Sequence, residues 1–120
     1  MSVLSNDAPG YDRKKNFGRK LRRAKKEKER TIENRCVNWL LGRYPKAMAL
    51  KLNTRFRNHW PDRAFFIPGG SLVLIEFKKP GENATPAQAK LHRELKSLGF
   101  PVHLSWGLDD FKKTIRELRF

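Results

Sequence analysis

The sequence has little cysteine and no long apolar run, and each absence excludes a class of protein. Cys36 is the one cysteine among 120 residues, so no disulfide can form within the chain, which suits a reducing compartment. No run approaches the ~20 apolar residues of a membrane-spanning helix, and residues 1–10 lack the hydrophobic stretch of a signal peptide. We therefore expect a cytoplasmic protein that is not inserted in a membrane.

Acidic residues are also few beside the basic ones. The chain has 27 Lys and Arg against 12 Asp and Glu, which gives a net charge of +15 and a pI of about 10.6. Such a charge favours binding to a polyanion, of which nucleic acid is a better candidate than an anionic membrane surface. A chain of this length with 38% hydrophobic residues is long enough for one domain with its own core.

The composition changes near residue 30. Residues 1–30 carry eleven Lys and Arg, four Asp and Glu, and almost no apolar periodicity. We expect a flexible basic extension that contacts phosphates, and the alternative is a solvated tail that aids solubility. The cations of this extension expected to bind nucleic acid include Arg22, Arg23, Lys25 and Lys26.

Hydrophobic periodicity predicts a folded domain over residues 31–120 with the order α-β-β-β-α-β-α. The expected helices cover residues 31–43, 86–98 and 108–118, and the expected strands cover 48–53, 63–67, 71–78 and 102–106. Thr31 and Thr85 have the residue type of N-caps, and Pro86 suits the first helical position. The β-α-β unit of residues 71–106 requires a parallel strand pair with a right-handed crossover. The predicted fold is therefore α/β, with a mixed four-stranded sheet flanked by helices.

A short turn sets the register of the second and third strands. Pro68-Gly69-Gly70 suits a three-residue hairpin loop built from a type I turn, with the last residue in the left-handed region. This register pairs Ile67 with Ser71 and, counted outward, places Asp62 opposite Glu76 on one face. Cβ atoms in such a pair lie about 4.5–5.5 Å apart. Lys78 shares that face because side chains alternate along a strand.

Two facing carboxylates and a lysine suggest a metal site. Asp62 and Glu76 repel each other unless one is protonated or a hard divalent cation such as Mg²⁺ lies between them. The carbonyl of Phe77 is a possible further ligand, and Glu33, from the inward stripe of the first helix, is another, directly or through water. With Lys78 stabilising charge on a phosphate, this set could hydrolyse a phosphodiester. The alternatives are structural acid–base pairs at a sheet edge and, for Glu33, a favourable contact with the helix dipole.

The motif Pro61-Asp62, followed by Glu76-x-Lys78, resembles the signature of the PD-(D/E)xK nucleases. A wider succession resembles their VRR-NUC branch, in particular its short stand-alone proteins from phages and bacteria. That succession comprises Pro61-Asp62-Arg63, Pro68-Gly69-Gly70, the run from Ile75 to Gly81, Gln88, and the run from Leu95 to Val102. The resemblance covers residues from about 31 to 118 and leaves out the basic extension.

The resemblance implies a restriction-endonuclease-like core and a DNA endonuclease that depends on Mg²⁺ or Mn²⁺. It also implies a homodimer that cuts branched DNA such as four-way (Holliday) junctions, in the cytoplasm of a bacterium or a phage-infected host. The catalytic residues that it implies are Glu33, Asp62, Glu76, Lys78 and Gln88. Two departures affect substrate contacts: His59-Trp60 stands where a small residue is common, and residues 55–58 replace a glycine-rich lead-in.

Several cations beside this predicted site are expected to contact DNA. They are Lys51, Arg55, Arg57, His59, Arg63 and Lys79. By contrast, His92 and His103 have no Cys or His partner at ligand spacing, and we interpret them as structural or surface residues. Two other functions stay open: a non-catalytic nucleic-acid-binding module that depends on charge alone, and an RNA-binding protein.

Overall fold

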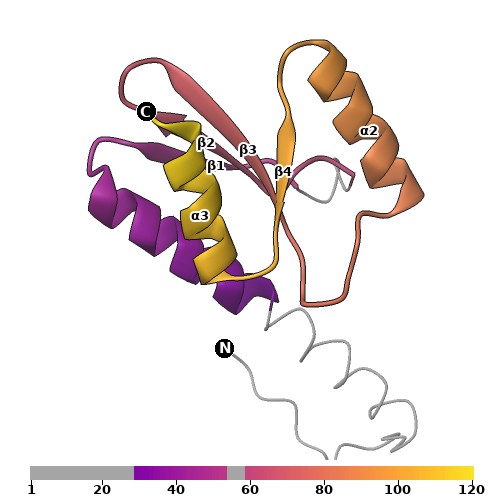
Figure 1. Ribbon diagram of the computed structural model, residues 1–120, viewed down its shortest axis with the longest axis horizontal. Helices are drawn as coiled ribbons and strands as arrows, with labels where there is room; N and C mark the ends of the chain where they lie inside the picture. The colour runs from indigo at the N-terminus through magenta and orange to yellow at the C-terminus, as the bar shows by residue number, and fades with distance from the viewer. Residues whose placement is uncertain (1–28, 54–58) are drawn as a thin grey trace, which may run out of the picture.

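The computed structural model describes residues 29–53 and 59–120 (Figure 1). Residues 29–43 are helical, and the elements that follow are β1 (Met48–Lys51), β2 (Arg63–Ile67), β3 (Ser71–Phe77), α2 (Pro86–Ser97), β4 (Val102–Ser105) and α3 (Leu108–Leu118). This is the predicted order α-β-β-β-α-β-α. The predictions for Arg22, Arg23, Lys25, Lys26, Arg55 and Arg57 lie outside the described residues.

The four strands form one mixed sheet in the order β1-β2-β3-β4. β1 pairs with β2 and β2 with β3 in the antiparallel sense, whereas β3 and β4 are parallel. Because α2 connects the parallel pair, the β-α-β unit is present as predicted. The mixed four-stranded sheet flanked by helices is thereby confirmed.

Helices cover the two faces of the sheet unequally. Figure 1 shows α3 and the indigo helix of residues 29–43 together on one side, and α2 on the other. The core lies under the first pair, where Cys36 and Leu40 from the first helix meet Phe111 of α3 and Phe65 of β2, all fully buried. Trp39 packs edge-on against Phe111, with the ring centroids 6.0 Å apart. The core therefore joins both helices to one face of the sheet and leaves α2 free to present polar side chains to the other.

The hairpin between β2 and β3 has the predicted register but a different turn. Ile67 pairs with Ser71, and the ladder runs outward to Arg63 and Ile75, one step short of Asp62 and Glu76. Gly70 has φ +90, as predicted, but Gly69 also has a positive φ of +100. The predicted type I turn is therefore wrong, because that turn requires a negative φ at its second central residue.

The two predicted N-caps have different outcomes. Thr85 caps α2, and with Gln88 it forms a capping box in which each side chain bonds the other's backbone N–H. Thr31 is not a cap, because residues 29 and 30 are already helical. Glu33 consequently lies beyond the first turn, where the helix dipole has little effect. A favourable contact with the helix dipole therefore does not explain why Glu33 stands at this position.

Several large apolar side chains stay exposed on the sheet face that carries α2. Met48, Phe66 and Leu72 are neighbours across β1, β2 and β3, and 70%, 46% and 41% of their surfaces are exposed. A cross-strand row of this kind is a candidate contact surface. Among the described helices, none has the length and apolar character needed to cross a membrane.

Candidate active site

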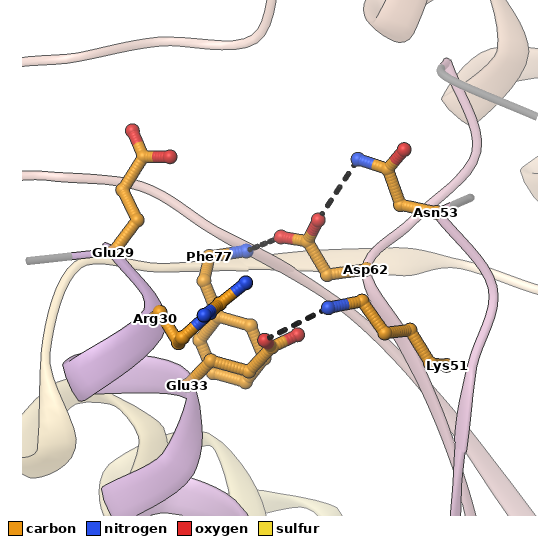
Figure 2. A pocket seen from close by; sticks show the side chains of 7 residues that line it. All are labelled: Glu29, Arg30, Glu33, Lys51, Asn53, Asp62 and Phe77. Carbon is orange, nitrogen blue, oxygen red and sulfur yellow. Dashed lines mark hydrogen bonds and ion pairs between the residues drawn. The ribbon is translucent and has the colours of Figure 1, made fainter. Parts of the chain in front are cut away.

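Asp62 is held across the hairpin at the end of the sheet. Its Oδ2 atom accepts a hydrogen bond of 2.7 Å from the backbone N–H of Phe77, and its Oδ1 atom accepts one of 3.1 Å from the Asn53 side chain (Figure 2). The backbone of Asp62 also accepts a bond from the N–H of Leu52, which extends the pairing of β1 with β2. These contacts orient the carboxylate toward the end of β3.

Glu76 is a buried carboxyl group beside Asp62. Only 2% of its surface is exposed. Burial, together with the Asp62 carboxylate within hydrogen-bonding reach, raises the pKa of Glu76 to about 9 against the opposing effect of Lys78. Without a cation, Glu76 is therefore protonated at neutral pH. The two carboxyl groups meet as the hairpin register predicts.

Lys78 and Gln88 form a buried pair next to Glu76. The Lys78 ammonium donates a hydrogen bond of 2.8 Å to the Gln88 side-chain oxygen, which also accepts from the backbone N–H of Thr85 at 3.0 Å. The amide nitrogen of Gln88 donates to Glu76 Oε1 at 3.4 Å. The capping box of α2 thus fixes the amide that orients both Lys78 and Glu76.

Glu33 faces the same region from the first helix, but its carboxylate is already paired. It accepts from Arg63 Nε at 3.2 Å. Figure 2 shows it beside Lys51, whose Nζ atom lies 3.8 Å away. Glu33 and Asp62 line one pocket of about 320 Å³, together with Glu29, Arg30, Lys51, Asn53 and Phe77. The structure therefore brings Glu33 to the pocket of Asp62 as a neutralised group.

Three residues of this region were not assigned to it from the sequence. Glu29 lines the pocket one turn before Glu33, and its pKa is raised by burial and by Glu82. His92 lies one turn after Gln88, with its Nε2 atom 3.7 Å from Glu76 Oε2. The i, i+4 spacing was a signal for both of these. The sequence contained no such signal for Asn53, because its contact with Asp62 depends on how β1 and β2 pair.

The cations predicted to contact DNA differ in how available they are. Among the described ones, Lys51 and His59 are exposed, and Lys51 lines the pocket. Arg63 is paired with Glu33, and Lys79 lies 3.8 Å from Glu82 with only 13% of its side chain exposed. Lys51 also lies 3.8 Å from Glu33, but 51% of its side chain is exposed. Lys51 and His59 are therefore better placed for a phosphate than Arg63 and Lys79.

The carboxyl pair fits a divalent cation by its chemistry. Asp62 and Glu76 are adjacent, and Glu76 stays protonated because none of the described residues nearby balances two negative charges. A divalent cation between them would supply that positive charge. Glu76 Oε2 is buried and has no hydrogen-bond partner among the described residues. No three His, Cys, Asp or Glu side chains gather around one point in the described ranges. Asp62 and Glu76 could hold a cation with the neighbouring Phe77 carbonyl, and Glu33 would need to leave its cationic partners to join them.

Comparison with known proteins finds a relative and a similar solved structure. No protein-family model matches the chain. The chain is 35% identical over 75 residues to "Putative nuclease p44" of Acyrthosiphon pisum secondary endosymbiont phage 1, a match that covers 62% of this chain and 78% of that protein. Its fold is similar to a solved structure described as "VRR_NUC domain", with a TM-score of 0.61 and 22% identity over 74% of this chain and 98% of the other. The relative and the shared fold together show that the chain belongs to the VRR-NUC family of nucleases.

Proposed function

We propose that this protein is an endonuclease that hydrolyses DNA phosphodiester bonds with the help of Mg²⁺ or Mn²⁺. The observation that carries the proposal is the meeting of Asp62 and Glu76 at the end of the sheet, with the pKa of Glu76 raised to about 9. Two adjacent carboxyl groups destabilise a fold unless one is protonated or a cation lies between them. The phage relative, whose name is "Putative nuclease p44", supports the same function.

The polar groups gathered at the end of the sheet have separate roles in this proposal. Asp62 and Glu76, with the Phe77 carbonyl, hold the cation, which when bound would polarise the attacking water and a phosphate oxygen. Glu76 must first release its proton. Lys78, fixed by Gln88 at 2.8 Å, places a positive charge where negative charge builds up on the phosphate. Glu33 either joins the cation site or keeps the first helix attached to Arg63.

Cleavage assays with matched variants test this function. Asp62→Asn and Glu76→Gln remove the carboxylates with little change in volume, so cleavage should fall by more than about a hundredfold, as expected when a catalytic metal is lost. DNA binding, measured on the same substrates in EDTA, should stay, because the net charge of +15 supplies it. Cleavage that persists in excess EDTA would overturn the proposal and leave a metal-independent nuclease.

The substrate is proposed to be branched DNA such as a four-way junction, and the active form a homodimer. Both follow from the resemblance to stand-alone VRR-NUC proteins, and two copies would supply two sites for paired cuts. The exposed row of Met48, Phe66 and Leu72 is a surface that such a dimer could bury. Cleavage of linear, forked and four-way DNA side by side tests the substrate. Light scattering tests the dimer, which a monomeric mass at micromolar concentration would exclude.

A non-catalytic nucleic-acid-binding module is the second candidate. It is favoured by the net charge of +15 and by the neutralisation of Glu33 by Arg63. It predicts binding that falls steeply with salt and does not respond to Mn²⁺. Competition among duplex DNA, branched DNA and RNA, with and without Mn²⁺, separates this candidate from the nuclease and identifies an RNA-binding protein directly.

A further inference from the structure

Between α2 and β3, two buried polar side-chain atoms of the described residues face each other, and neither has a hydrogen-bond partner. Glu76 Oε2 and His92 Nε2 are the buried side-chain atoms that lack one among the described residues, and they lie 3.7 Å apart. Buried polar groups in folded proteins are nearly always paired, because an unpaired one loses its hydration without compensation. Two unpaired atoms that face each other therefore point to an interaction that the site can form.

The distance between these two atoms indicates which interaction they can form. At 3.7 Å the contact is too long for a hydrogen bond, and the gap is too short for a water molecule to bridge. Closing it by less than about 1 Å gives an ordinary hydrogen bond between the imidazole and the carboxyl group. Both side chains are nearly enclosed, with 13% of His92 and 3% of Glu76 exposed, so water competes little for either atom.

The other oxygen of Glu76 is already held from the same helix. Gln88 Nε2 donates to Glu76 Oε1 at 3.4 Å, and His92 follows Gln88 by one helical turn. Gln88 is itself fixed by the capping box and by Lys78. Two side chains one turn apart on α2, Gln88 and His92, therefore point at the two oxygens of the Glu76 carboxyl group.

We propose that His92 is a positioning residue that holds the second carboxyl oxygen of Glu76 and so fixes its orientation toward Asp62. The inference rests on the proposed cation site and deepens it. His92 is not assigned as a ligand, because no three acidic, His or Cys side chains of the described residues gather around one point. It acts through Glu76, as partners behind a ligand orient that ligand and tune its affinity.

Mn²⁺ binding to the full-length protein, measured by isothermal titration calorimetry without DNA, tests the role of His92. His92→Phe keeps a ring of similar shape but has no hydrogen-bonding atom, and it should weaken Mn²⁺ binding by about 10–100-fold, the range for lost partners behind a ligand. His92→Gln places a polar nitrogen at a similar reach and should bind Mn²⁺ nearly as the wild type does. His103→Phe is the control: His103 lies next to β3 in the sheet, but none of the side-chain hydrogen bonds or ion pairs among the described residues joins its ring to Glu76.

The outcomes separate this inference from the proposed function. Thermal unfolding in EDTA shows that each variant is folded, and His92→Leu replaces His92→Phe if the latter is not. Wild-type affinity in His92→Phe, or equal losses in His92→Phe and His92→Gln, would overturn the positioning role alone. If Asp62→Asn binds Mn²⁺ as the wild type does, the proposed site itself is wrong, and the role of His92 fails with it.

Discussion

At the scale of single residues, Glu76 has an environment that opposes its own ionisation. It is buried, the carboxylate of Asp62 adjoins it, and Lys78 compensates only partly, which raises its pKa from the ordinary 4.5 to about 9. Such a perturbation by burial and one specific charge is typical of functional groups. It also links the stability of the cation-free protein to pH.

The first prediction concerns this link. Because the pKa of Glu76 is higher in the folded than in the unfolded chain, its contribution to stability is complete below 4.5 and is lost as the pH rises toward 9. The midpoint of thermal unfolding in EDTA should therefore fall between pH 7 and pH 9. In this range His92 and His103, whose pKa values are lowered by burial, stay neutral.

Glu76→Gln is the control for the pH dependence. The amide cannot ionise, so the variant should lose most of the fall in midpoint between pH 7 and pH 9. Parallel curves for the wild type and the variant would show that Glu76 titrates normally. Added Mn²⁺ should raise the wild-type midpoint, because a ligand that binds only the folded state stabilises it.

At the scale of elements, α2 depends on a cap that also serves the site. Thr85→Ala removes the hydroxyl that accepts from the Gln88 N–H, and helix capping residues contribute about 1 kcal/mol. We expect a loss of about that size in urea unfolding. Mn²⁺ binding should weaken less, because the Gln88 backbone loses one anchor while its side chain keeps its bonds to Lys78 and to the Thr85 backbone N–H. Thr114→Ala, in the middle of α3, should leave Mn²⁺ binding intact. Unchanged Mn²⁺ affinity in Thr85→Ala would show that the N-cap of α2 does not contribute to the cation site.

The first helix is attached to the sheet by a polar contact as well as by the core. Glu33→Gln leaves the largely buried Arg63 without its charged partner, with 18% of that side chain exposed, and should lower stability by about 1–3 kcal/mol. Urea unfolding measures this loss. The double variant Glu33→Gln with Arg63→Met should recover part of it if the pair is structural. If cleavage nevertheless stays low in the stable double variant, Glu33 serves the reaction as well.

The elements differ in how well the sequence predicts them, for physical reasons. β2 and α3 have the predicted bounds because β2 is a short apolar run that stops at the Pro68-Gly69-Gly70 turn, whereas the apolar residues of α3 recur at helical spacing. The first helix begins earlier than predicted, before Thr31. The sequence did not indicate this, because the residues before Thr31 are charged or polar and show no apolar period. Asp62 and Glu76 were placed by the hairpin register, which is local. Asn53 and the pairing of Glu33 with Arg63 depend on contacts between distant segments, which no local pattern encodes.

At the scale of the whole molecule, the net charge of +15 should dominate affinity for DNA. Replacing Arg22, Arg23, Lys25 and Lys26 together by Gln should weaken binding and make the slope of log affinity against log salt shallower by up to ~3.6, at ~0.9 per lost phosphate contact. Fluorescence anisotropy at several salt concentrations measures this slope. Mn²⁺ affinity should not change.

A charge-matched variant makes that experiment specific. Replacing Lys46, Lys112, Lys113 and Arg116 by Gln removes the same number of charges from the part of the chain that the structure describes. If the N-terminal cations contact phosphates directly, this second variant should change the slope less. Equal slopes in the two variants would show that only the total charge matters, and that residues 1–30 have no particular place on DNA.

The position of Cys36 gives the chain a built-in chemical reporter. Its thiol is the one thiol of the sequence, it is fully enclosed between the first helix and the sheet, and burial raises its pKa to about 12. An alkylating reagent can reach it only when the core opens, because the reactive species is the exposed thiolate. The rate of labelling therefore measures how often the first helix separates from the sheet. Occupation of the distant carboxyl pair by Mn²⁺ should slow that labelling in proportion to the stability that it adds.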